Sequence, residues 1–211
     1  YRVVYTSIGI DELARRVVRR FVVANQFTFI YHKFMASTEY TSSGDTMLPH
    51  KLRTFIIEDD TRVISFEDEV FDTLDETWDK RTIQHIITAE TNVRLGFVIT
   101  QNESSYSDVG FDDISYSTNG IDFTGLNTST TFKWRRVSGE RNDTYSESNL
   151  INTITSGSTP TSGSTNGYVN LDNSTTAKNT GMVALTGTYA YFEGSGGVYG
   201  TVYIVTESIN I

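Results

Sequence analysis

The 211-residue chain contains no cysteine, two prolines and three histidines, and its 26 acidic residues outnumber its 17 basic ones. Without cysteine, disulfide bonds and thiolate metal sites are excluded. The net charge of −9 argues against a nucleic-acid partner, because phosphate binding needs a basic surface. No apolar run approaches the ~18 residues of a membrane span, so we expect no membrane insertion. We interpret the start at Tyr1, without Met, as the mark of a processed product or a fragment.

Aromatic residues are abundant, and the twelve tyrosines and twelve phenylalanines favour strands. Runs with strand character recur along the whole sequence. They span residues 25–34, 52–58, 62–66, 82–88, 92–100, 109–117, 121–123, 131–138, 167–171, 182–186, 189–192 and 199–206. An Asn-Gly pair at 119–120 marks a hairpin turn. Strands at this spacing, without βαβ alternation, predict an all-β fold, a jelly-roll-like β-sandwich.

Helical periodicity is convincing only over residues 10–24, where we predict one short helix near the N-terminus. Composition shifts near residue 139, and TSGST sequences on both sides of Pro160 predict a Ser/Thr/Gly-rich loop over 152–167. We therefore predict a first unit over 1–118, with strands over 25–118, and a second β-rich piece over 119–211. One permuted sandwich is the alternative.

Acidic residues cluster between Glu58 and Asp79. Within this run Glu67 and Glu69 would share one face of a strand, with side chains ~7 Å apart, which is compatible with the two carboxylates of a glycosidase. The run EDEVFD, residues 67–72, resembles the E-x-D-x-x-E signature of concanavalin-like glycanases, but two of its three acidic positions differ in type. A solvated acidic strand is the simpler interpretation, and we expect no catalytic residues.

Oxygen ligands suit calcium, and surface β-sandwiches often contain a structural calcium site. The adjacent carboxylates of Asp112 and Asp113, at a strand end, are the first candidates for calcium as a cofactor, and Asp172 and Asn173 are secondary ones. The histidines have no metal-site spacing and are assigned structural roles. They are His32, His50 and His85.

Seven segments follow one another in a recognisable order. In the first piece they are FTFIYHKF (27–34), LRTFIIEDDTRVISF (52–66), ETWDKRTIQHI (76–86) and NVRLGFVITQNESSYSDVGFDDISYS (92–117). In the second they are FKWRRVSGERND (132–143), NGYVNLDNSTTAKNTGMVALTG (166–187) and TYAYFEGSGGVYGTVYIVTES (188–208). They resemble segments of the MAM domain, a jelly-roll β-sandwich of extracellular adhesion and receptor proteins, with its D-D-[IV] signature at residues 112–114. The cysteines of animal MAM domains are absent, which favours a bacterial surface or virion protein.

The resemblance and the composition together predict a non-enzymatic surface structural or adhesion module. We expect it in a virion (phage tail, baseplate or decoration protein) or an extracellular assembly, self-assembling by strand addition or engaging other surface proteins. The alternative is a carbohydrate-binding module, in which exposed aromatic rings stack on sugars. Candidate rings are those of Tyr106, Tyr116, Tyr145 and Tyr168. Sequons that a eukaryotic secretory pathway could glycosylate lie at Asn102, Asn127, Asn142 and Asn173.

Overall fold

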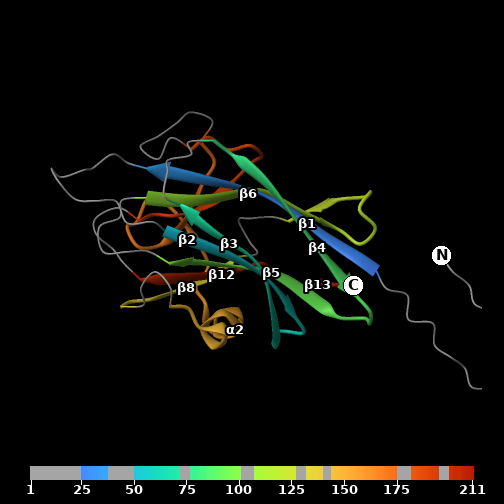
Figure 1. Cartoon of the computed structure of the whole chain (residues 1–211). Coiled ribbons are helices and arrows are strands. Elements are labelled where there is room, and N and C mark those ends of the chain that lie inside the picture. The colour runs from blue at the N-terminus through green and yellow to red at the C-terminus, as the bar shows by residue number, and fades with distance from the viewer. Residues whose placement is uncertain are drawn as a thin grey trace, which may run out of the picture.

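The computed structural model describes residues 25–37, 50–71, 77–100, 107–126, 132–139, 144–174, 182–194 and 200–211. Within these ranges the chain forms two packed β-sheets and one α-helix (Figure 1). The all-β sandwich predicted from strand spacing is therefore confirmed. The helix predicted over residues 10–24 lies outside the described residues.

The seven-stranded sheet is antiparallel except at one edge, where β9 and β10 are parallel. Its spatial order is β4 (Asp79–Ile87), β1 (Asn25–Ser37), β6 (Ser107–Ser117), β11 (Tyr189–Phe192), β10 (Val169–Asp172) and β9 (Thr161–Ser162), and β7 (Thr124–Gly125) pairs with β6. The six-stranded sheet has the order β3 (Arg62–Phe71), β2 (His50–Glu58), β5 (Asn92–Thr100), β12 (Thr201–Val205) and β8 (Lys133–Val137), and β13 (Ile209–Asn210) pairs with β5.

Strands from both halves of the sequence share these two sheets. In the seven-stranded sheet β11 pairs with β6, so that Ala190 lies opposite Phe111. In the six-stranded sheet β12 pairs with β5, so that Ile204 lies opposite Phe97. The pieces before and after residue 118 therefore form one sandwich with a common core. The outer strands of the two sheets are β4, β9, β3 and β8, and strand addition from a neighbouring subunit stays a prediction.

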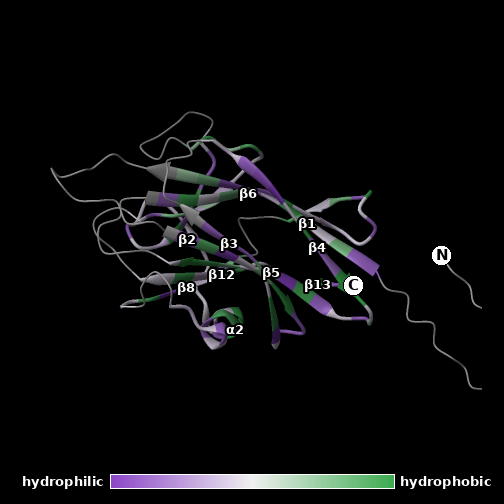
Figure 2. Cartoon of the chain, viewed as in Figure 1, coloured by the Kyte–Doolittle hydropathy of each residue, from purple (hydrophilic) through white to green (hydrophobic). Residues whose placement is uncertain are grey.

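The core lies between the sheets and follows the alternation of side chains along each strand (Figure 2). Phe97 of β5 stacks on Phe111 of β6 with ring centroids 4.2 Å apart, and Tyr31 of β1 meets Phe97 edge to face at 5.0 Å. The Tyr31 hydroxyl is hydrogen-bonded to Thr54 Oγ1 of β2 at 2.9 Å, which satisfies the one polar atom of this ring. Aromatic contacts between the sheets thus define how one packs on the other.

The helix α2 (Glu147–Ser156) covers the outer side of the six-stranded sheet. It begins at Ser146, whose hydroxyl caps the helix by accepting a hydrogen bond from Asn149 N. Leu150 is fully buried against strand residues such as Phe55 and Tyr203. This helix was not predicted, and the loop predicted over 152–167 is wrong for residues 152–156, which belong to α2, and for residues 161–162, which form β9. Within the described part of the chain, no helix has the length and hydrophobicity to span a membrane.

The outer side of the seven-stranded sheet has a small apolar cluster of its own. Phe34, Met182 and Tyr189 are buried together there, with Trp78 packed against them. The Trp78 indole donates a hydrogen bond to the Val183 carbonyl at 2.7 Å, so the indole ties the chain before β4 to the chain before β11. This cluster holds the segment before β11 flat on the sheet, next to the cavity described below.

Candidate functional site

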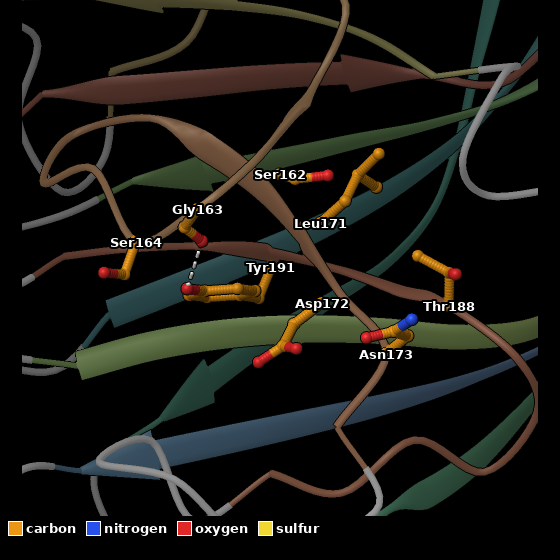
Figure 3. Close-up of a pocket in the computed structure, with 8 residues that line it drawn as sticks. All are labelled: Ser162, Gly163, Ser164, Leu171, Asp172, Asn173, Thr188 and Tyr191. Atoms are coloured by element: carbon orange, nitrogen blue, oxygen red, sulfur yellow. Dashed lines mark hydrogen bonds between the residues drawn. The ribbon is translucent and has the colours of Figure 1, made fainter.

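A cavity of about 450 Å³ lies at the β9–β10 edge of the seven-stranded sheet. Its volume falls within the roughly 300–1,000 Å³ typical of small-ligand sites. The lining is mostly polar and comes from three stretches of the chain, residues 162–164, 171–173 and 188–191, whose side chains Figure 3 draws. The residues are Ser162, Gly163, Ser164, Leu171, Asp172, Asn173, Thr188 and Tyr191. Hydroxyl, amide and carboxylate groups therefore converge on one hollow.

Tyr191 of β11 connects the cavity to the sheet. Its ring is almost completely buried, and its hydroxyl donates a hydrogen bond to the Gly163 carbonyl at 3.0 Å. Figure 3 shows this contact joining the ring to the segment that follows β9. The hydrogen bond fixes one wall of the cavity to the centre of the sheet.

The next residues along the same wall are held by a buried amide. Asn170 of β10 is fully buried, and its Oδ1 accepts a hydrogen bond from Thr165 N at 3.0 Å. Its Nδ2 donates to the carbonyls of Thr165 and Tyr168, at 3.0 and 3.1 Å. A buried side-chain amide with three of its hydrogen bonds made orders the turn that it spans. These hydrogen bonds fix the turn over residues 165–168, which directly follows the lining residues Gly163 and Ser164.

Asp172 is the one carboxylate among the residues lining the cavity. Its Oδ1 accepts a hydrogen bond from Ser174 N at 3.0 Å, and its Oδ2 accepts one from the Tyr189 hydroxyl at 3.2 Å. These hydrogen bonds connect Asp172 to the segment that follows β10 and to β11. Asn173 follows it and is exposed at the cavity.

A second pair of acidic side chains is buried on the same sheet. Asp108 of β6 is 1% exposed and Glu193, directly after β11, is 7% exposed. Asp108 Oδ1 accepts a hydrogen bond from Gly194 N at 2.8 Å. Burial, together with the negative charge of Glu193, raises the pKa of Asp108 to about 8. Near neutral pH Asp108 therefore retains its proton.

Asp112 and Asp113, the predicted calcium ligands, have different surroundings. Asp112 is buried, and its Oδ2 accepts hydrogen bonds from the backbone N–H groups of Leu185 and Thr186, at 2.6 and 3.2 Å. Its Oδ1 accepts from Asp113 N at 2.7 Å and from the Thr186 hydroxyl at 3.3 Å. Asp113 is exposed, with a left-handed backbone (φ 48°), and its Oδ2 lies 3.5 Å from His32 Nδ1. The geometry gives Asp112 the role of an anchor for residues 185–186.

Calcium binding at these two residues stays a prediction. No group of three or more His, Asp or Glu side chains in the described ranges is arranged to hold a metal ion. The secondary candidates, Asp172 and Asn173, lie side by side on the cavity.

Glu67 and Glu69, the carboxylates weighed as a glycosidase pair, are also in unlike environments. Glu67 is exposed, whereas Glu69 Oε2 lies 2.7 Å from Lys33 Nζ, and its other oxygen pairs with Arg81. Because Glu69 belongs to the six-stranded sheet and both cations to the seven-stranded one, this ion cluster links the sheets at their β3 and β4 edges. A structural role accounts for Glu69.

The histidine side chains that the structure describes make structural contacts. His85 Nε2 lies 2.7 Å from Glu58 Oε1, and the His85 ring meets Phe66 edge to face. His32 neighbours Asp113, as described above. The side chain of His50 lies outside the described residues.

The aromatic residues suggested for sugar stacking are spread over the molecule. Tyr168 is 48% exposed and meets Trp134 edge to face, at 5.2 Å between centroids. Tyr145 packs on Phe55 beside α2, and Tyr116 packs on the core. Tyr106 lies outside the described residues. The three rings that the structure describes are therefore not gathered into one binding face.

Sequence reasoning did not find the cavity. Strand β11 was predicted over 189–192, but nothing in the sequence relates Tyr191 to Gly163, 28 residues earlier. Comparisons with protein-family models, with curated proteins and with solved structures find no match to this chain.

Proposed function

We propose that this protein is a non-enzymatic surface adhesion module of an extracellular or virion assembly, and that it binds saccharides in the cavity beside β10. The observation that supports this proposal is the lining of the cavity. Three hydroxyl residues, Ser162, Ser164 and Thr188, line it together with Asp172 and Asn173, and Figure 3 shows these side chains around Tyr191. Sugars are recognised by such groups, because each sugar hydroxyl both donates and accepts hydrogen bonds.

Preorganisation adds support. Tyr191 holds the lining residue Gly163 by a hydrogen bond of 3.0 Å, and Asn170 holds the turn that follows the lining through three hydrogen bonds of 3.0–3.1 Å. Weak ligands such as sugars gain affinity when the binding groups need no reordering, since the conformational entropy is already lost on folding. The cavity therefore has the rigidity that a hydrogen-bonding site requires.

The position of the cavity suits presentation to a surface. Tyr191 lies opposite Gly110, which in turn lies opposite Phe34 of β1. Phe34 and Asn25 lie in the same strand, and at about 3.3 Å per residue the distance along β1 between them is roughly 30 Å. Ile211 lies at the same end of the sandwich as Asn25 (Figure 1). The cavity is thus directed away from the points where the described chain enters and leaves the sandwich.

The use of acidic residues agrees with a non-enzymatic role. Asp112 is saturated by hydrogen-bond donors, Glu69 is paired with two cations, and Asp108 and Glu193 are buried against each other. The carboxylates of Asp112 and Glu69 thus connect parts of the sandwich to one another. Catalysis of glycoside cleavage needs two carboxyls across a substrate, and the cavity lining contributes one.

Screening on a glycan array tests the proposal. Protein made in bacteria should be used, because Asn173 begins an Asn-Ser-Thr sequon and an attached glycan would fill the cavity. We expect binding to at least one saccharide class, and Asn173→Ala should weaken that binding about tenfold, equivalent to ~1.4 kcal/mol.

The matched control is Gln84→Ala, an exposed polar residue of β4, four strands away from β10 in the same sheet. It should bind like the unmodified chain. If folded protein shows no hit among neutral, amino and acidic glycans, saccharide binding is wrong and an assembly role without a glycan ligand becomes the better proposal.

A further inference from the structure

Positive charge gathers on β8, at the edge of the six-stranded sheet (Figure 1). Three of its five residues are cations, Lys133, Arg135 and Arg136, and each is partly exposed. Their side chains form no ion pair or hydrogen bond with a described residue. Other cations of the described chain are paired with carboxylates, namely Lys33, Arg53, Arg62, Arg81 and Arg94. Within the described part of the chain, the charge of β8 is therefore not neutralised.

An exposed aromatic ring lies next to this strand. Tyr168, directly before β10, meets Trp134 of β8 edge to face, with ring centroids 5.2 Å apart. The Tyr168 side is 48% exposed, whereas Trp134 is 7% exposed. Because side chains alternate along a strand, Arg136 lies on the same face of β8 as Trp134, roughly 7 Å further along. A cation and an exposed ring thus lie together where β8 of one sheet approaches β10 of the other.

Backbone hydrogen bonds hold both members of the aromatic pair. Trp134 exchanges two of them with Ser158, at 2.9 and 2.8 Å. The Tyr168 carbonyl accepts from Glu193 N at 3.0 Å and from Asn170 Nδ2 at 3.1 Å. The carboxyl of Glu193 is 7% exposed and hydrogen-bonded to that of Asp108, so it is turned to a buried partner. The exposed ring therefore has a fixed position beside the cations.

We propose that Tyr168, Arg135 and Arg136 form a subsite for a sugar that carries a carboxylate or sulfate. The Tyr168 ring contacts the apolar face of the sugar, and a guanidinium binds the anionic group through charge-assisted hydrogen bonds. This inference rests on the proposed function and names an acidic saccharide as its ligand. The turn over 165–168 directly follows the lining residues Gly163 and Ser164, so the subsite adjoins the cavity along the chain.

A few cations suit an acidic sugar better than a nucleic acid. A nucleic acid is held by roughly six to ten phosphate contacts, and the net charge of −9 disfavours the approach of such a polyanion. One uronate or sulfated sugar needs only an ionic contact and a ring. The ligand class is therefore a saccharide with isolated negative charges.

The test uses two probes that share one backbone, tetragalacturonate and its methyl ester, titrated calorimetrically into the protein at low salt. We expect the acid form to bind at least tenfold more tightly than the ester. Raising the NaCl concentration should weaken binding of the acid form and leave that of the ester nearly unchanged, since salt screens exposed charges.

Two variants that remove the same charge separate the subsite from the charge of the whole chain. Arg136→Gln should weaken binding of the acid form at least fivefold. Lys80→Gln, at an exposed cation of β4 in the other sheet, should not change it. Tyr168→Ala should weaken binding of both forms, and Tyr168→Phe, which keeps the ring, should restore most of the lost affinity. Circular dichroism checks that each variant is folded.

Equal affinity for the acid and the ester, or equal losses in Arg136→Gln and Lys80→Gln, would overturn the inference. So would a loss in Asn173→Ala with none in Arg136→Gln, because the acidic sugar would then bind in the cavity alone. Equally tight binding of poly-glutamate or of a DNA oligonucleotide would show a general anion surface rather than a sugar subsite. If neither probe binds to a chain that recognises other glycans, the subsite is wrong and the proposed function stands; if no glycan binds at all, both are wrong.

Discussion

Replacing Asp112 with alanine is expected to lower the free energy of unfolding by about 3–5 kcal/mol, the range for removing one partner of a buried, charged hydrogen-bonded set. The carboxylate is 1% exposed and accepts hydrogen bonds from three backbone N–H groups and one hydroxyl. Without it, the N–H groups of Leu185 and Thr186 lose their acceptor in a site that the Asp112 side chain no longer fills. Urea denaturation at pH 7 measures the loss.

The neighbouring residue supplies a matched comparison. Asp112→Asn should cost part of this free energy, because its amide NH₂ must face an N–H donor. Asp113→Asn should change stability by less than about 0.5 kcal/mol, since Asp113 is exposed and Asn tolerates the left-handed backbone found there. A calcium site at Asp112 and Asp113 predicts the opposite: similar losses in both Asn variants, and a fall in the melting temperature on chelation. Equal effects at the two positions would refute the anchor role of Asp112.

Strand positions were predictable where apolar residues alternate with polar ones along the sequence or form a continuous apolar run. The runs 92–100 and 189–192 match β5 and β11 at both ends, because nearly every side chain of these strands is buried. The acidic run after Phe66 was less informative. The predicted strand ended at Phe66, whereas β3 continues through the acidic run to Phe71. The strand can continue because cations of the opposite sheet neutralise the charge of Glu69. A partner 36 residues away in sequence cannot be inferred from alternation.

The helix α2 and the cavity were not predictable for related reasons. The helix sequence ESNLINTITS is dominated by residues that favour turns and caps, and its apolar stripe consists of Leu150, Ile151 and Ile154. Packing of Leu150 on the sheet overrides that weak propensity. The cavity requires the pairing of β10 with both β9 and β11, and strand order is a property of topology rather than of local pattern. The sequence did single out Asp172 and Asn173 as oxygen ligands, and both line the cavity.

Stability should fall as pH rises, and Asp108→Asn should remove most of that fall. The pKa of Asp108 is about 8 in the folded chain, against an ordinary value of 3.8 when unfolded. Between these values the folded state binds more protons, so the free energy of unfolding decreases with rising pH and levels off above about pH 8. At ~1.4 kcal/mol per pKa unit, the total is on the order of several kcal/mol. Chemical denaturation from pH 5 to pH 9 measures it.

The asparagine variant keeps the shape of a protonated Asp108: its Oδ1 can accept from Gly194 N, and its Nδ2 can donate to Glu193. Near pH 5 the free energy of unfolding of this variant should match that of the unmodified chain within about 1 kcal/mol, and at pH 9 the variant should be more stable by about 2 kcal/mol or more.

Glu193→Gln should flatten the pH profile of stability in the same way. The double variant should add little, because one neutral partner already removes the repulsion. Asp122→Asn, at an exposed loop position, is the control and should leave the profile unchanged. Parallel pH profiles for Asp108→Asn and the unmodified chain would mean that Asp108 does not hold its proton in the folded chain near neutral pH.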